Sequence, residues 1–468
     1  MEHELDDSFI NDDIIWKIIA ENHRADSGKV KEILAKAREL NGLSLDEAAS
    51  LMNVSDPALL AEMFAAANTV KNAIYGRRMV IFAPLYISNL CNNECLYCAF
   101  RVKNKDVVRR ALTQEEIARE TKILIDQGHK RVLLVAGESY PGQEGFQYVL
   151  DSIKTIYSVK SGPGEIRRVN ANIAPLTTDE FRQLAGTGIG TFQLFQETYH
   201  RETYHKVHVA GKKTNYAWRV TAFDRAMEAG ISDVGIGVLF GLFNWHFETI
   251  AMLQQIRHLE EKFGVGPHTI SVPRIEPAVG SNMAEHPPAA VSDIDFRKIV
   301  AILRLTVPYT GIIMSTRETA NLRQKLFALG VSQISGGSRT NPGGYSEAGL
   351  QEDTEAQFSL GDQRTLDEVI HDVAEMGYIP SFCTGCYRLG RTGKDFMDLA
   401  RPGEIRHHCD PNAFSTFQEY LIDYASPETK KIGETLINSA VREMEPSVRA
   451  TTEKMVADVR SGKRDVYC

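Results

Sequence analysis

The sequence has no long hydrophobic run and no excess of positive charge. None of its apolar stretches approaches the roughly 20 residues that a membrane-spanning helix requires. Lysine and arginine number 53 against 61 aspartates and glutamates, a net charge of −8, whereas proteins that bind nucleic acid or anionic membranes are typically basic. Residues 1–13 are acidic and contain no apolar core, so we expect no secretory signal. The sequence therefore predicts a cytoplasmic protein with no nucleic-acid or membrane partner.

Cysteine is scarce, with seven residues in a chain of 468. This number excludes the dense disulfide framework of small secreted proteins. Six of the seven fall into two groups, the first triplet (Cys91, Cys95 and Cys98) and the second triplet (Cys383, Cys386 and Cys409). Such grouping indicates metal-binding thiols in a reducing compartment. Cys468 remains, at a chain end of the kind that is commonly poorly ordered, and we assign it no role.

Short β-rich segments alternate with amphipathic helical segments from about residue 80 onward. The predicted strands are residues 81–88, 131–136, 168–173, 190–195, 233–239, 269–273, 312–315 and 333–335. Eight β–α alternations are what a complete (βα)8 TIM barrel of the α/β class requires, and a doubly wound open sheet is the alternative. We expect a helical N-terminal segment (1–78), the barrel (79–352) and a helical, cluster-binding C-terminal extension (353–468).

The first triplet directly follows the first predicted strand, in the spacing CxxxCxxC. Three thiolates so close together can face one metal centre, and no fourth cysteine lies nearby in the sequence. A structural zinc site would be closed by four ligands. A [4Fe–4S] cluster held by three cysteines would instead leave one iron open to a small molecule.

The second triplet has the spacing CxxC followed by a third cysteine after 22 residues. Either His407 or His408 could complete a zinc site with these thiols, since zinc accepts a mixed set of sulfur and nitrogen ligands. A second three-cysteine iron–sulfur cluster is the other interpretation. The chemistry of the residues does not decide between the two.

The first triplet, with the aromatic Tyr97 before its last cysteine, resembles the radical S-adenosylmethionine (SAM) superfamily. Ala136-Gly137-Glu138, at the end of the second predicted strand, resembles the GGE motif of that superfamily, with alanine in place of the first glycine. The resemblance implies a [4Fe–4S] cluster whose open iron binds SAM. It further implies the SAM-binding residues Tyr97, Gly137, Glu138, Gln196, Glu197 and Arg219, the last of them for the SAM carboxylate. A solvated helix arginine is the alternative interpretation of Arg219.

Residues 381–388 and 409–413, around the second triplet, resemble the C-terminal extension of one branch of the radical SAM aromatic amino acid lyases. This branch comprises the tyrosine lyases that mature the [FeFe]-hydrogenase, and the resemblance extends over essentially the whole chain. It implies that L-tyrosine is cleaved to p-cresol and dehydroglycine. It also implies an auxiliary [4Fe–4S] cluster with a labile fifth iron and a free cysteine-type amino acid ligand, where carbon monoxide and cyanide form. The implied partners are a reducing flavodoxin or ferredoxin and other hydrogenase maturation proteins.

Three further residues have positions that suit this chemistry. Arg317 follows the seventh predicted strand and Ser335 ends the eighth, where barrel active sites form, so both are candidates for binding the substrate. A surface helix start and a turn serine are the alternatives. His268 begins the sixth strand, towards the opposite end of the barrel, and is our candidate ligand for the labile iron. A core histidine is the alternative.

Two other functions compete with the two-cluster tyrosine lyase. The first is a 2-iminoacetate synthase of thiamine biosynthesis, with a structural metal in the extension. The second is an iron–sulfur carrier without enzymatic activity. About eight or nine irons per chain after anaerobic reconstitution would favour the lyase, and about four the synthase.

Overall fold

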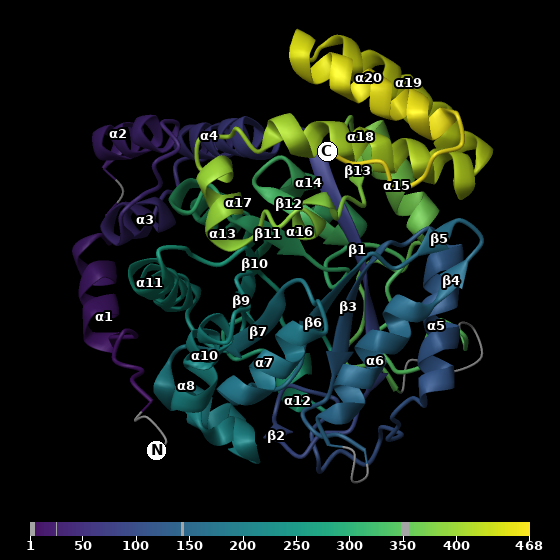
Figure 1. Cartoon of the computed structure of the whole chain (residues 1–468). Coiled ribbons are helices and arrows are strands. Elements are labelled where there is room, and N and C mark those ends of the chain that lie inside the picture. Colours follow the sequence, from purple (N-terminus) through teal and green to yellow (C-terminus); the bar gives the residue numbers. More distant parts are fainter. Residues whose placement is uncertain (1–4, 25, 142–144, 348–354) are drawn as a thin grey trace.

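The chain folds around a closed barrel of parallel strands (Figure 1). The computed structural model describes residues 5–24, 26–141, 145–347 and 355–468. The barrel strands are β1 (Arg78–Ser88), β3 (Arg131–Ala136), β6 (Arg168–Asn172), β7 (Phe192–Glu197), β9 (Val234–Val238), β10 (Thr269–Ser271), β11 (Gly311–Met314) and β12 (Val331–Ser335). Each pairs in parallel with its neighbours in this order. No helix in these ranges is long and apolar enough to span a bilayer.

Closure of the sheet between β12 and β1 decides the fold class. Val80 of β1 pairs with Gln333 of β12, and Phe82 pairs with Ser335. The predicted (βα)8 barrel is therefore confirmed, and the open sheet is wrong because an open sheet has no such closing pair. The helices in the connections between the strands are α5 (Gln114–Asp126), α6 (Gln147–Ser158), α7 (Thr178–Gly186), α8 (Arg201–Val207), α9 (Tyr216–Val220), α10 (Ala222–Glu228), α11 (Trp245–Phe263), α12 (Asn282–Glu285), α13 (Asp293–Thr306) and α14 (Ala320–Phe327).

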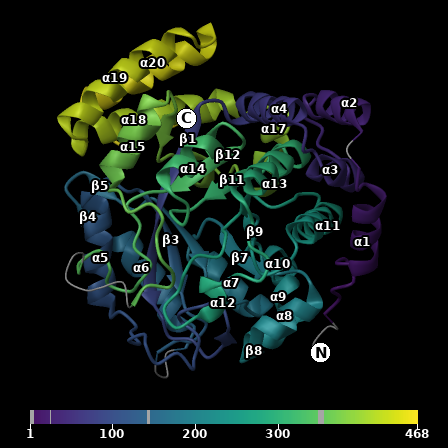
Figure 2. The ribbon, with the colours of Figure 1, turned by 180° about the vertical axis from the view of Figure 1, so that it is seen from behind.

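Four helices precede the barrel in residues 5–24 and 26–77, as the N-terminal pattern predicts. They are α1 (Asp12–Glu21), α2 (Ser27–Ala37), α3 (Leu45–Met52) and α4 (Pro57–Tyr75). A capping box begins α3, since the Ser44 hydroxyl accepts from the Glu47 backbone N–H and the Glu47 carboxylate accepts from the Ser44 N–H. These helices pack along one side of the barrel on α11 and α13 (Figure 2).

The C-terminal extension contributes a strand as well as helices. Its elements are α15 (Leu366–Glu375), β13 (Ile379–Ser381), α16 (Gly385–Arg388), α17 (Gly393–Ala400), α18 (Arg406–Asp423), α19 (Pro427–Arg442) and α20 (Pro446–Arg460). The sequence pattern did not predict β13, which pairs in parallel with the first three residues of β1. The extension therefore lies at the end of the barrel where the strands begin (Figures 1 and 2). The predicted boundary at residues 352 and 353 falls outside the described residues.

A buried charge cluster joins α18 to the barrel. Glu419 of α18 accepts a hydrogen bond from Arg167 at 2.7 Å and lies 3.1 Å from Lys130 Nζ, and all three side chains are at least 97% buried. Burial alone would raise the pKa of Glu419, but Lys130 and Arg167 hold it at about 2. The carboxylate is therefore ionised at all but very low pH.

We expect Glu419→Gln to lower the free energy of unfolding by about 3 kcal/mol at pH 7, because two buried cations lose their counter-charge. The depressed pKa stabilises the wild type fully above the unfolded value of about 4.3, and this stabilisation is lost as the pH falls towards 2. Urea unfolding at pH 7 and at pH 3 should show the difference between the two proteins narrowing in acid. Glu202→Gln, at an exposed ion pair with Lys206, serves as the control and should leave stability unchanged.

Candidate functional site

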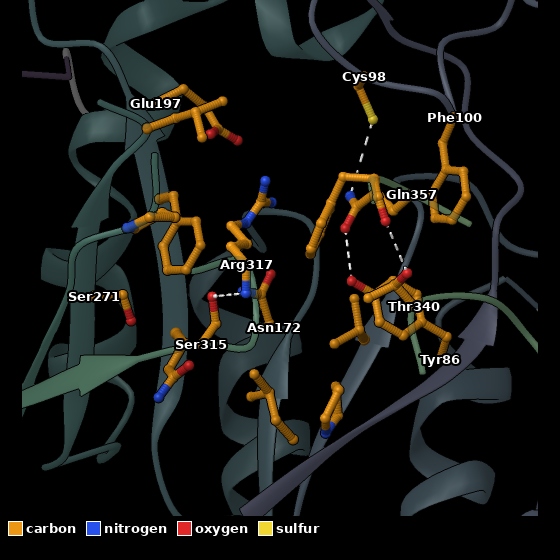
Figure 3. Close-up of a pocket in the computed structure, with 18 of the residues that line it drawn as sticks. Tyr86, Cys98, Phe100, Asn172, Glu197, Ser271, Ser315, Arg317, Thr340 and Gln357 are labelled. Carbon is orange, nitrogen blue, oxygen red and sulfur yellow. Dashed lines mark hydrogen bonds between the residues drawn. The ribbon is translucent and has the colours of Figure 1, made fainter. Parts of the chain in front are cut away.

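The first cavity opens at the C-terminal ends of the barrel strands and has a volume of about 180 Å³. The first triplet lines it together with predicted site residues from its own loop and from five other parts of the chain. These are Tyr97, Gly137, Glu138, Glu197, Arg219, Arg317 and Ser335. Figure 3 shows part of this cavity, with Arg317 projecting into it among side chains from several strands. Residues far apart in the sequence are thus brought to one space.

Close backbone packing holds the loop that carries the first triplet. The two-residue strand β2 (Glu94–Cys95) pairs with β8 (His208–Ala210), and the Tyr97 hydroxyl lies 2.8 Å from His208 Nε2. A Cβ atom on Gly137 would lie 2.2 Å from the Leu90 carbonyl oxygen. Only glycine fits at this point, so the glycine of the motif allows the loop to lie against the end of β3.

The three thiols of the first triplet suit a cluster. Burial raises the pKa of Cys91 and Cys95, and it raises that of Cys98 to about 11. Burial thus disfavours the thiolate forms, and a bound metal would supply the compensating charge. Within the described ranges, no three His, Cys, Asp or Glu side chains stand close enough to share a single metal ion. A [4Fe–4S] cluster presents several irons, so three sulfurs around one cavity fit it.

A charged group beside the first triplet consists of two carboxylates and two cations. Arg219 donates to Glu138 at 2.8 Å, and Lys213 donates to Glu197 at 2.6 Å. Asn93, in the triplet loop, also donates to Glu138 at 2.8 Å. Arg219 is 4% exposed, so the interpretation as a solvated helix arginine is wrong. Paired cations and carboxylates are what the carboxylate and amino groups of an amino acid would contact.

Gln196, a predicted SAM-binding residue of β7, and Tyr199, two residues beyond that strand, lie elsewhere. Gln196 and Tyr199 do not line the first cavity, and the Tyr199 hydroxyl is buried against Gln255. Gln193 lines it instead, because alternate residues of a strand face opposite sides. This alternation was available in the sequence and would have favoured Gln193 over Gln196. Glu197 also lines it, beyond a register shift in β7 and with a φ of 73°.

Arg317 lines the first cavity and forms no ion pair with any described carboxylate. Its guanidinium lies 3.3 Å from the centre of the Phe358 ring. Glu318, the neighbour that could have paired with it at a surface helix start, accepts from Arg274 instead, at 2.8 Å. Ser335 is 2% exposed, and its hydroxyl oxygen accepts from the Thr316 backbone N–H at 3.1 Å. Arg317 is therefore a cation available for an anionic ligand.

Gln357 makes a contact with the first triplet that the sequence did not indicate. Its Nε2 lies 3.9 Å from Cys98 Sγ, and its Oε1 accepts from the Tyr86 hydroxyl at 2.7 Å (Figure 3). The Tyr86 bond fixes the amide so that its N–H groups face the sulfur. A hydrogen bond to a ligand sulfur stabilises the reduced form of an iron–sulfur cluster.

We expect Gln357→Leu to lower the reduction potential of the first cluster by about 40 mV, the equivalent of one hydrogen bond of about 1 kcal/mol. Redox titration followed by electron paramagnetic resonance (EPR) would measure this reduction potential. Both proteins compared would also carry Cys386→Ser, so that the second cluster is absent. Thr340→Val is a matched control, because the Thr340 hydroxyl lines the same cavity but donates to the Phe358 carbonyl. An unchanged or higher potential in Gln357→Leu would contradict the assignment.

A second cavity, of about 60 Å³, lies at the opposite end of the barrel. The second triplet and His268 line it together, with residues of β1, β12 and the extension. His268 and these cysteines thus lie around one cavity, and a role of His268 as an iron ligand stays a prediction. Among the described residues, the two cavities share no lining residue.

His268 is oriented by two polar neighbours. Its Nε2 lies 3.3 Å from the Tyr387 hydroxyl, and its Nδ1 lies 3.6 Å from a carboxylate oxygen of Asp233. Burial lowers the pKa of His268, and Asp233 opposes this effect. The neutral imidazole that burial favours is the form that binds a metal.

Comparison with known proteins places these cavities in context. Residues 85–258 match the Radical SAM superfamily and residues 271–379 the Biotin and Thiamin Synthesis associated domain. The chain is 28% identical to the 2-iminoacetate synthase of Escherichia coli (strain K12), over 79% of this chain and 94% of that protein. A crystal structure of HydG, a maturase of the [FeFe]-hydrogenase, is 49% identical, with a TM-score of 0.94 over 98% of this chain and all of that one. The maturase HydG from Carboxydothermus hydrogenoformans is 40% identical, with a TM-score of 0.84 over 97% of this chain and all of that one.

Proposed function

Because the chain belongs to the HydG family of [FeFe]-hydrogenase maturases, we propose that it is a radical SAM tyrosine lyase. It cleaves the Cα–Cβ bond of L-tyrosine to give p-cresol and dehydroglycine. Dehydroglycine is converted to carbon monoxide and cyanide at an auxiliary cluster, and an Fe(CO)2(CN) unit for the hydrogenase active site results. The working location is the cytoplasm. The partners are a reducing flavodoxin or ferredoxin and other maturation proteins.

The arrangement of the two cavities supports this proposal most strongly. Gln333 and Ser335 face the same side of β12, yet Gln333 lines the second cavity and Ser335 the first. Val80 and Phe82 divide between the cavities in the same way on β1. Two residues of strand span about 7 Å. A two-carbon fragment formed in the first cavity would therefore reach the second through the interior of the barrel, shielded from water.

The residues of the first cavity have separate roles in this proposal. The cluster of the first triplet, with SAM bound, supplies a 5′-deoxyadenosyl radical. Glu138 accepts from the SAM amino group, and Arg219 binds the SAM carboxylate. Arg317 binds the carboxylate of tyrosine in a bidentate contact, and Ser335 adds a hydroxyl contact. The remaining wall is largely aromatic and aliphatic, and it excludes water from the reacting atoms.

The residues of the second cavity hold the auxiliary [4Fe–4S] cluster and its labile iron. The second triplet binds the cluster. His268 binds the fifth iron, with a free cysteine-type amino acid as a further ligand.

Anaerobic reconstitution of the full chain with iron and sulfide tests the proposal. We expect about eight or nine irons per chain, p-cresol on addition of SAM, reductant and tyrosine, and carbon monoxide captured by deoxyhaemoglobin. Absence of p-cresol would refute a tyrosine lyase.

The similarity to a 2-iminoacetate synthase favours one alternative. A synthase of this kind would also form p-cresol, but it would release no carbon monoxide and would bind about four irons. The same experiment therefore separates the two functions.

A further inference from the structure

The segment 463–468 is docked on the extension, contrary to the expectation of a poorly ordered end. Arg464 donates two hydrogen bonds to the Asp423 carboxylate of α18, at 2.6 and 2.5 Å. Asp465 forms an ion pair with Arg388 of α16, which lies two residues beyond Cys386. Each of these contacts fixes the segment beside the elements that carry the second triplet.

Cys468 itself is held at the start of α18. Its backbone N–H donates to Asn412 Oδ1 at 2.8 Å, and its carbonyl oxygen accepts from Asn412 Nδ2 at 3.1 Å. Its thiol donates to the His408 carbonyl at 3.8 Å, one residue before Cys409. An S–H group is a weak donor, so this last contact costs little to break.

Arg391 links Cys468 to the other cysteines. Its Nη2 donates to the Cys468 carbonyl at 2.5 Å, while its backbone N–H donates to the Cys386 carbonyl at 2.8 Å. Burial raises the pKa of Cys468, Arg391 lowers it, and the Cys383 thiol is near enough to raise it further. The seventh cysteine therefore lies beside the segments that carry Cys386 and Cys409, although 59 positions separate it from Cys409 in the sequence and it does not line the second cavity itself.

A separate observation shows that the second cavity is built for an anion. Arg78 lines it and is 5% exposed, yet its Nε and Nη1 have no hydrogen-bond partner in the described residues. Arg131 also lines it, with Nη1 donating to the Cys383 carbonyl at 2.7 Å and Nε unpartnered. Arg78 interacts electrostatically with Asp410 but forms no ion pair with it, and a buried cation without a paired counter-charge is costly. An iron–sulfur cluster with several thiolate ligands is anionic and supplies that charge.

We propose that Cys468 is a fourth iron-binding thiol of the second site, at the position that the second triplet leaves open. Rotation about its Cα–Cβ bond releases the sulfur from His408 while the backbone stays in place. In the step, the S–H bond breaks, an Fe–S bond forms, and the proton passes to solvent without any change of oxidation state. The amino acid ligand or cyanide then competes with Cys468 for this position. The inference rests on the proposed function in that the second triplet must hold a cluster.

Alkylation of the full chain by iodoacetamide, followed by mass spectrometry, tests the first consequence. We expect Cys468 to react at least about tenfold more slowly after reconstitution than in the apoprotein. Most Cys468 would then be bound to iron, and the free thiol that iodoacetamide alkylates would be a minor population. The protection should disappear in Cys386→Ser, which lacks an intact second cluster. If the second triplet is protected and Cys468 reacts at the apoprotein rate, the inference is wrong. If the second triplet is not protected either, the proposed function fails with it.

Burial of Cys468 alone could also slow its alkylation, so a second measurement is needed. Binding of potassium cyanide to the reduced second cluster, followed by EPR, would not change with burial of Cys468. Removal of a competing ligand should lower the half-saturating cyanide concentration about tenfold in Cys468→Ser. Tyr467→Phe keeps the ring that packs over Arg388 and should behave as the wild type. Equal half-saturation in Cys468→Ser and the wild type would overturn the inference.

Discussion

Cys386→Ser is expected to abolish carbon monoxide release, by at least about 100-fold, while p-cresol continues to form. The residue lines only the second cavity, which shares no described lining residue with the first. Serine is close in size to cysteine but is a poor iron ligand, so the fold is retained and the second cluster is not. Carbon monoxide is measured by its binding to deoxyhaemoglobin and p-cresol by chromatography, on the same reaction.

Cys95→Ser is the matched variant at the other end of the barrel. It removes one ligand of the first triplet and should abolish both products, because the radical forms only there. Iron content should fall by about four atoms in each of the two variants. Parallel loss of p-cresol and carbon monoxide in Cys386→Ser would contradict the separate roles of the two cavities.

Arg317→Lys is expected to raise the KM for tyrosine about 100-fold, the equivalent of about 3 kcal/mol for a lost bidentate contact between charged groups. Lysine keeps the positive charge but lacks the planar fork that matches a carboxylate. SAM binding should persist, because the substitution leaves the proposed SAM contacts, Glu138 and Arg219, in place. Formation of p-cresol over a range of tyrosine concentrations gives the KM, and 5′-deoxyadenosine reports the SAM reaction in the same samples.

Arg182→Lys provides the control for this substitution. Arg182 is an exposed arginine paired with Asp179 on α7, far from the lining of either cavity. Its replacement should leave both measurements unchanged. If Arg317→Lys bound tyrosine normally, another cation of the first cavity would have to hold the substrate carboxylate.

The barrel and its two cysteine groups could be predicted from the sequence because they depend on local patterns. The alternation of strands and helices can be recognised from the hydrophobic pattern of each segment by itself. The structure confirms all eight strands predicted in this way. The spacing of the first triplet and the strand ends at Arg317 and Ser335 located the first cavity by the same logic. The close approach of Gly137 to Leu90 explains why that motif contains a glycine.

The sequence by itself therefore determined the fold, the two cysteine groups and the family. Only the tertiary structure decided which other side chains serve them. Gln357 reaches Cys98 across 259 positions, and Lys213 meets Glu197 through a short helical turn without a recognisable motif. Cys468, to which the sequence assigned no role, lies beside the segment that carries Cys409 because segment 463–468 folds back on α18. Contacts of this kind follow from how distant segments pack, and no local period or spacing encodes them.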